Sequence, residues 1–165
     1  MPRKFTNPRR TTSSKPSHID CPRIAKKHRV DPLTPAERSH RMSLIKGKNT
    51  KIELIIQSSL RERKLRFKKH VSSLPGKPDV VFEKAKVAVF VDGNFWHGYA
   101  FDSWKHKMAP FWQQKIQANI RRDRRNFQRL RRSGWKVIRI WEQAARKNLE
   151  REIGRIESAL ANRVV

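Results

Sequence analysis

The stretch PDVVFEKAKVAVFVDGNFWHG, residues 78–98, decides the fold that we expect for this chain. Two apolar runs are joined by the short link EKAK, and so short a link predicts a hairpin of two antiparallel strands. Asp79 opens the first strand and Asp92 ends the second, so both carboxylates are expected at one edge of the sheet. Phe95, Trp96 and His97 follow at once, which is unusual directly after a strand and points to a function.

The flanking sequence supplies the rest of an α/β fold. Residues 66–70 predict a third strand before the hairpin, and the alternation at 135–141 predicts a fourth. Helices are expected from Pro35 after a capping box at Thr34, at 51–64 after Thr50, at 110–132 and at 148–161. Because the last strand is reached through a long helix, we expect a mixed β-sheet flanked by helices. The apolar face expected for the second helix is Ile52, Ile55, Ile56, Ser59 and Leu60.

The charge of the chain indicates a polyanionic partner. Lys and Arg number 40 against 14 Asp and Glu, a formal charge of +26, which favours nucleic acid over the alternatives, a ribosome-like RNA binder or an anionic membrane surface. The longest aliphatic-aromatic run is five residues, so no membrane span is expected. The single cysteine, Cys21, excludes an intramolecular disulfide and favours a cytoplasmic location, with the nucleoid in a bacterium.

Two segments are expected along the chain. Residues 1–30 are basic and poor in apolar anchors, which predicts a flexible arm that follows phosphates or only increases solubility. Residues 31–165 are expected to form one domain. Its helix at 110–132 carries many arginines beside an apolar stripe that includes Trp112, and Lys115, Asn119 and Asp123 lie four apart on another face.

Three acids are expected to converge at the sheet edge. Asp79, Asp92 and the helical Glu53 offer hard oxygen ligands, which suit Mg²⁺ with substrate phosphate oxygens. His97 follows closely enough to accept a proton from an attacking water. Each acid alone also has a structural explanation, as a cap or a turn residue.

Five blocks of the sequence resemble the very short patch repair (Vsr) endonuclease family. These are SLPGKPDVVF, VAVFVDGNFWHG, FWQQKIQANIRRDRR, GWKVIRIWE and the opening DPLTPAERSHRMSLIKGKNTKIELIIQSSL, within residues 31–142. The resemblance implies the PD-(D/E)xK superfamily, whose fold is a restriction-endonuclease-like three-layer sandwich. It further implies DNA repair by Mg²⁺-dependent nicking of one strand at T:G mismatches, the product of 5-methylcytosine deamination.

The resemblance also assigns roles to the active-site positions. Asp79 would bind Mg²⁺, with a contact from the backbone carbonyl of Val91, and Glu53 would support the metal-bound waters. His97 would be the general base. Asp92 falls where members of the family carry either histidine or aspartate beside the active site, and we count it among the catalytic residues.

A second set of positions would contact DNA. Phe95, Trp96 and Trp112 would insert beside the mismatch, although the spacing of Trp112 also fits a core residue. The further DNA-binding residues expected on the long helix are Lys115, Asn119, Arg121, Arg122 and Arg125.

The chain departs from the family at its zinc site. The ligand positions correspond to Asn94, Tyr99, Phe101 and Gln143, and the only cysteine is Cys21, so no structural zinc is expected. Local packing of Tyr99, Phe101 and Trp104 is expected to hold this loop instead. Asn94 also occupies the position of the superfamily lysine, whose task the histidine takes over in the Vsr family.

Two alternative functions remain open on the sequence. One is a strand-nicking nuclease of the same fold with another target, in defence or a mobile element. The other is a DNA-binding protein that has lost catalysis. The expected partner is double-stranded, mismatched DNA. Mismatch-repair proteins are candidate protein partners, and the protein is expected to be a monomer.

Overall fold

The computed structural model describes residues 33–44 and 49–163, so the arm expected at 1–30 lies outside the described residues. The strands are β1 (Lys68–Lys69), β2 (Val80–Phe82), β3 (Val87–Asp92) and β4 (Lys136–Trp141). The helices are α1 (Pro35–Ser43), α2 (Lys51–Glu62), α3 (Phe101–Trp104), α4 (Pro110–Arg132), α5 (Glu142–Lys147) and α6 (Leu149–Ala161), with a short 3-10 helix, η1 (Lys105–Lys107).

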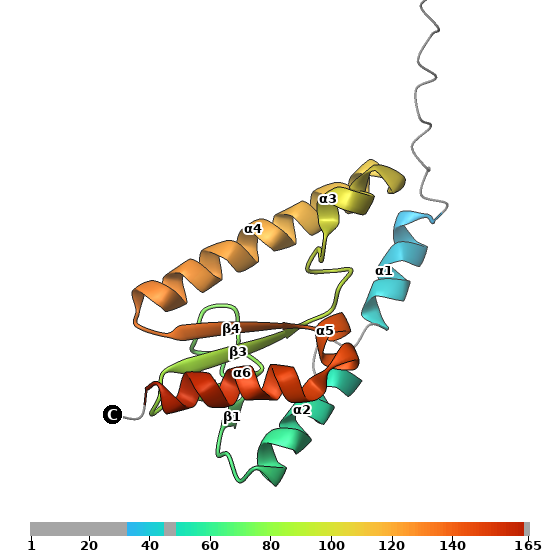
Figure 1. The fold of residues 1–165 in the computed structure, drawn as a ribbon. Coiled ribbons are helices and arrows are strands. Elements are labelled where there is room, and N and C mark those ends of the chain that lie inside the picture. The colour runs from blue at the N-terminus through green and yellow to red at the C-terminus, as the bar shows by residue number, and fades with distance from the viewer. Residues whose placement is uncertain (1–32, 45–48, 164–165) are drawn as a thin grey trace, which may run out of the picture.

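The four strands form one mixed sheet in the order β1-β2-β3-β4 (Figure 1). The tight link between β2 and β3 makes them antiparallel, with Val80 opposite Val89, and β1 also pairs antiparallel with β2. β4 lies parallel to β3, because α4 carries the chain back along the sheet before β4 begins. The mixed sheet expected from the sequence is confirmed.

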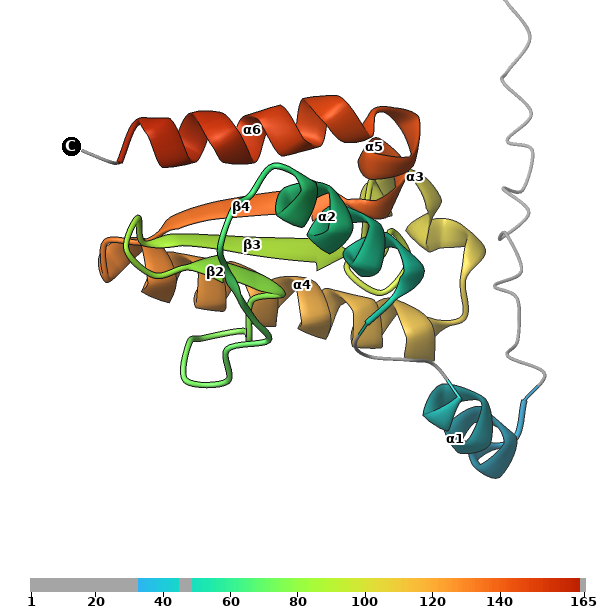
Figure 2. The same cartoon turned by 90° about the horizontal axis from the view of Figure 1, so that it is seen from below.

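Helices cover both faces of this sheet, which confirms the three-layer α/β sandwich. Figure 2 shows α4 on one side, and α2 and α6 on the other. Alternate residues of β3 enter different layers: Val87 and Val89 join the core with α2 and α6, whereas Ala88 and Phe90 pack with Phe127 of α4. The whole of β3 is buried, as expected for a central strand covered on both faces.

Most predicted helix boundaries are confirmed. Thr34 and Glu37 form the capping box of α1, Thr50 caps α2, and α4 has the predicted bounds. The second helix differs in one residue of its apolar face: Ile55 is 39% exposed, because α2 meets the sheet and α6 along a narrower stripe. The first strand is also shorter than expected, and α3 and α5 were not predicted.

Among the described residues, no helix is both long and apolar enough to cross a membrane.

Candidate active site

A cleft of about 870 Å³ opens where β2 begins and β3 ends, between α2 and α4. It is lined by all four predicted catalytic residues, Glu53, Asp79, Asp92 and His97. Within the described ranges, the possible metal ligands of this cleft fall into two groups, each with ligand atoms within 4.8 Å of one another. The first group is Glu53, His70 and Asp79, and the second is Asp92, His97 and Asp123.

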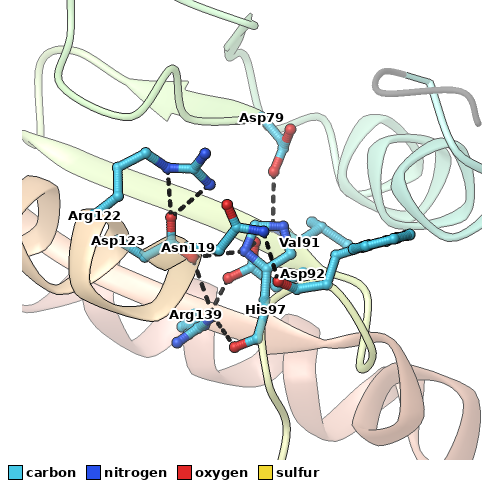
Figure 3. Close-up of polar contacts among 9 residues, drawn as sticks. Asp79, Val91, Asp92, His97, Asn119, Arg122, Asp123 and Arg139 are labelled. Atoms are coloured by element: carbon cyan, nitrogen blue, oxygen red, sulfur yellow. Dashed lines mark hydrogen bonds and ion pairs between the residues drawn. The ribbon is translucent and has the colours of Figure 1, made fainter. Parts of the chain in front are cut away.

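Asp79 is held at the start of β2 by the neighbouring strand. Its backbone N–H donates to Val89 O, and its Oδ2 accepts a hydrogen bond of 2.7 Å from the Val91 N–H (Figure 3). Burial raises the pKa of Asp79 to about 7; the Val91 hydrogen bond opposes this rise, and the charges of Glu53 and Asp92 add to it. A buried carboxylate so short of positive charge is suited to a cation.

Glu53 has both a capping role and a place in the cleft. It is 4% exposed, and its carboxylate accepts hydrogen bonds from the Asn49 N–H at 2.9 Å and the Thr50 hydroxyl at 2.8 Å. These bonds fix the carboxylate at the first turn of α2, which packs across the sheet edge. Glu53 lies near Asp79, as expected, because these hydrogen bonds at the start of α2 hold its carboxylate there.

His70 joins these two acids, and sequence reasoning missed it. Its Nδ1 lies 3.7 Å from Asp79 Oδ1, and its Nε2 lies 3.9 Å from Glu53 Oε2. His70 follows β1 with a left-handed backbone, φ +47°. The sequence held one signal for it: in the predicted meander, the strand ending at His70 runs beside the strand that Asp79 opens.

His97 is oriented by two carboxylates rather than one. Its Nδ1 lies 2.7 Å from Asp123 Oδ2 and 3.2 Å from Asp92 Oδ1 (Figure 3). Because both acids contact the same ring nitrogen, Nε2 is the nitrogen left for a substrate or water. The sequence placed Asp79 and Asp92 at one edge; in the structure, they line one cleft but belong to different groups of ligands.

The two carboxylates beside His97 differ in their electrostatics. Burial raises the pKa of Asp92, and the interactions with His97 and Arg139 offset this only in part. Burial also acts to raise the pKa of Asp123, but hydrogen bonds from His97 and Arg122 outweigh it, so that this pKa is lowered. Of the two carboxyl groups, Asp123 therefore favours the ionised form more strongly.

Asp123 and Arg139 are site residues to which the sequence gave no role. The spacing of Asp123 from Lys115 and Asn119 was visible, but not its contact with His97. Arg139 interrupts an otherwise mostly apolar strand, β4, and its Nε lies 2.6 Å from Asp92 Oδ2. A charged residue facing inward in such a strand is a signal that could have found it.

The three aromatic residues expected at DNA lie together beside the cleft. The ring centroids of Phe95 and Trp96 are 4.7 Å apart, and those of Trp96 and Trp112 are 5.6 Å apart. Phe95 is 44% exposed, and Trp112 belongs to neither buried core cluster of the described residues. Asn119 Nδ2 donates to Trp96 O at 3.1 Å, which ties this group to α4.

The predicted basic residues of α4 are not equivalent. Arg121 and Arg125 are exposed, and Lys115 Nζ lies 5.9 Å from the ring centroid of Trp112. Arg122, by contrast, forms an ion pair of 3.0 Å with Asp123 Oδ1. Arg122 therefore belongs to the His97 network as well as to the basic face of α4.

Aromatic packing occupies the region where the family carries zinc. Trp104 Nε1 donates to Tyr99 O at 2.7 Å, and the Trp104 ring packs edge-on against Phe101 with centroids 5.1 Å apart. The Asn94 side chain accepts from the Gln143 N–H at 3.4 Å, so two of the positions to which the resemblance assigns zinc ligands meet directly. The expected packing is confirmed for Phe101 and Trp104, whereas the ring of Tyr99 packs on Trp141, with centroids 5.1 Å apart.

Comparisons with known proteins identify the family of this chain. The family described as DNA mismatch endonuclease Vsr matches residues 30–103. The type II nicking enzyme V.NmeDIP of Neisseria meningitidis serogroup C is 43% identical over 122 residues, covering 72% of this chain and 82% of that protein.

Two further relatives extend the match. The type II nicking enzyme V.HpaIIP of Haemophilus parainfluenzae is 36% identical, covering 82% of this chain and 99% of that protein. The DNA mismatch endonuclease Vsr of Escherichia coli K12 is 38% identical, covering 67% of this chain and 72% of that protein. The chain therefore belongs to the Vsr family of DNA endonucleases.

Proposed function

We propose that this protein nicks one strand of duplex DNA at T:G mismatches by Mg²⁺-dependent hydrolysis. The observation that carries the proposal is the cleft in which Asp79, Trp96 and His97 meet. Asp79 can bind a cation, His97 can accept a proton, and Trp96 can insert between stacked nucleobases. All three face one cleft, on a chain with a formal charge of +26.

The donors around Asp79 fit a divalent cation. Asp79 is buried and Glu53 lies within the same group of ligand atoms, so two hard carboxylates are available, with His70 as a neighbouring donor. Val89 O and the Val91 N–H both bond to Asp79, so by strand alternation the Val91 carbonyl points to the same side. A cation held there would stabilise the charge that develops on the scissile phosphate.

His97 is arranged to act as a general base. With its proton on Nδ1, the ring donates to Asp123 at 2.7 Å and leaves the lone pair of Nε2 for the proton of an attacking water. The carboxylates of Asp123 and Asp92 would stabilise the imidazolium that forms. This arrangement follows the same physical logic as a histidine oriented by a buried aspartate in other hydrolases.

The aromatic group supports selection of mispaired DNA. Insertion of Phe95, Trp96 and Trp112 would unstack a base step, which costs about a few kcal/mol and least at a mismatch. The exposed arginines of α4 supply phosphate contacts, so affinity should fall with salt at a slope of about −0.9 per contact. The match to the family described as a DNA mismatch endonuclease favours this target.

A second candidate is nicking at a different target. Several relatives, including those of Neisseria meningitidis and Haemophilus parainfluenzae, are named type II nicking enzymes. The loop that carries Phe95 and Trp96 is held by aromatic packing in place of the zinc site of the family, so its target can differ while the hydrolytic residues stay the same.

Nicking of labelled duplexes tests the proposal. One duplex carries a single T:G pair and the other is fully paired, each with Mg²⁺ or EDTA, beside the Asp79→Asn variant. We expect a nick in the T strand of the mismatched duplex alone, lost with EDTA and in the variant. Equal cutting of both duplexes would support the second candidate, and tight binding without cutting would leave a DNA-binding protein.

A further inference from the structure

We propose that Arg139 is the positioning residue that holds the His97 imidazole in its reactive orientation. The inference rests on the proposed role of His97 as the general base. It concerns a residue on β4, far in sequence from the hairpin that carries the hydrolytic motif.

Arg139 contacts both carboxylates beside the His97 ring and the backbone carbonyl of His97. Its Nε lies 2.6 Å from Asp92 Oδ2, while the other oxygen of this carboxylate faces His97 Nδ1 at 3.2 Å. Its terminal Nη2 donates to the backbone carbonyl of His97 at 3.4 Å and lies 3.7 Å from Asp123 Oδ2. One guanidinium thus ties together the backbone of His97 and both carboxylates beside its ring (Figure 3).

The guanidinium is itself held in place. Its central carbon lies 3.9 Å from the ring centroid of Trp141 and 5.3 Å from that of Phe127. β4 pairs in parallel with β3, with Arg139 opposite Phe90 and Trp141 opposite Asp92, so the side chain reaches along the α4-facing side of the sheet. A planar, stacked donor with several N–H groups suits this task better than a flexible ammonium.

Charge gives a second reason for this assignment. Asp92 is 5% exposed, and a buried charge is costly unless an opposite charge lies beside it. The side chain of Arg139 is 25% exposed, so its charge acts on Asp92 with little screening. Arg139 supplies that opposite charge, with its Nε 2.6 Å from Asp92 Oδ2, while Asp92 Oδ1 faces His97 Nδ1 at 3.2 Å.

The first test separates chemistry from DNA binding. Arg139→Gln should lower the single-turnover nicking rate at saturating DNA by about 10- to 100-fold, part of the contribution of a general base. The dissociation constant for DNA should change by less than about threefold, because Arg139 is proposed to act on His97 and not on a phosphate; loss of a phosphate contact would weaken binding and lower the salt slope together. Arg151→Gln is the matched control, because Arg151 is exposed on α6 in the opposite layer.

Two further variants and one spectrum distinguish positioning from general destabilisation. Asp92→Asn/Arg139→Gln should nick faster than Arg139→Gln alone, since no unpaired carboxylate remains. Arg139→Lys should recover part of the rate. The ¹⁵N shifts of the His97 ring should report a proton on Nδ1 in the wild type and a mixture of tautomers in Arg139→Gln.

Each outcome decides one of the two ideas. If Arg139→Gln nicks at the wild-type rate, or loses DNA affinity as much as rate, the inference about Arg139 is wrong. An unchanged His97 spectrum in that variant would also overturn it. The proposed base is tested separately with His97→Gln: if that variant nicks normally, the role of His97 fails, whatever Arg139 does.

Discussion

Nδ1 of His97 lies 2.7 Å from Oδ2 of Asp123, a residue 26 positions further along the chain on a different element. The contact joins the loop after β3 to the middle of α4, and it selects which ring nitrogen carries the proton.

Asp123→Asn should lower the nicking rate by about 10²–10⁴-fold, because an amide no longer selects the Nδ1–H tautomer or stabilises the imidazolium. Single-turnover nicking at saturating DNA measures this. Affinity for the DNA should remain close to that of the wild type. A variant with a normal rate would show that the Asp123 contact serves only folding.

Asp79 should make stability depend on pH when no divalent cation is bound. Its pKa is raised from 3.8 to about 7, so the folded state binds more protons than the unfolded state between these values. Stability should therefore fall as pH rises from about 4 to about 7, by about 4 kcal/mol at most. Thermal unfolding across this range, with EDTA, measures the effect.

The Asp79→Asn variant is the control for this behaviour. It should lose this part of the pH dependence, and at pH 8 it should be stabilised less by Mg²⁺ than the wild type. An equal rise in melting temperature on adding Mg²⁺ to both proteins would mean that the cation binds elsewhere.

Trp96→Ala should reduce the preference for mismatched DNA more than it reduces nicking itself. Stacking of one base on an aromatic side chain contributes about 1–3 kcal/mol, so the ratio of T:G to paired cutting should fall by about 5- to 150-fold. The ratio is measured in one reaction with two labelled duplexes. Equal losses on both duplexes would contradict the role of Trp96 in selection.

Gly98→Ala should displace the loop that carries His97. Gly98 has φ +70°, and an added Cβ would lie 2.4 Å from Ile120 Cδ1. We expect a loss of about 1–3 kcal/mol in the free energy of unfolding, together with slower nicking. Denaturant titration and nicking assays on the same preparation measure both.

Gly154→Ala in α6 is the matched control for this change. An added Cβ there meets nothing within 4 Å, and alanine favours the helix by up to about 1 kcal/mol. This variant should be as stable as the wild type or more so, with normal nicking. If both alanine variants behave alike, the close approach of Gly98 to Ile120 does not control the loop.

Local patterns allowed much of the fold to be predicted. The capping box of α1, the Thr50 cap of α2 and the helical period of residues 110–132 depend on neighbours three or four positions away, so α1, α2 and α4 were predicted with accurate starts. The hairpin of β2 and β3 follows from its short link. Ile55 was misplaced, since the width of a buried helix face depends on what packs against it.

The residues of the candidate active site also separate into those that the sequence predicted and those that only the structure identified. The sequence by itself determined that Asp79, Asp92 and His97 come to the end of one hairpin, because a short link makes its two strands antiparallel neighbours. Only the tertiary structure decided that His70 joins Glu53 and Asp79, and that Asp123 and Arg139 hold His97. Those contacts depend on α4 crossing the sheet and on β4 pairing in parallel with β3, and packing across many residues sets both.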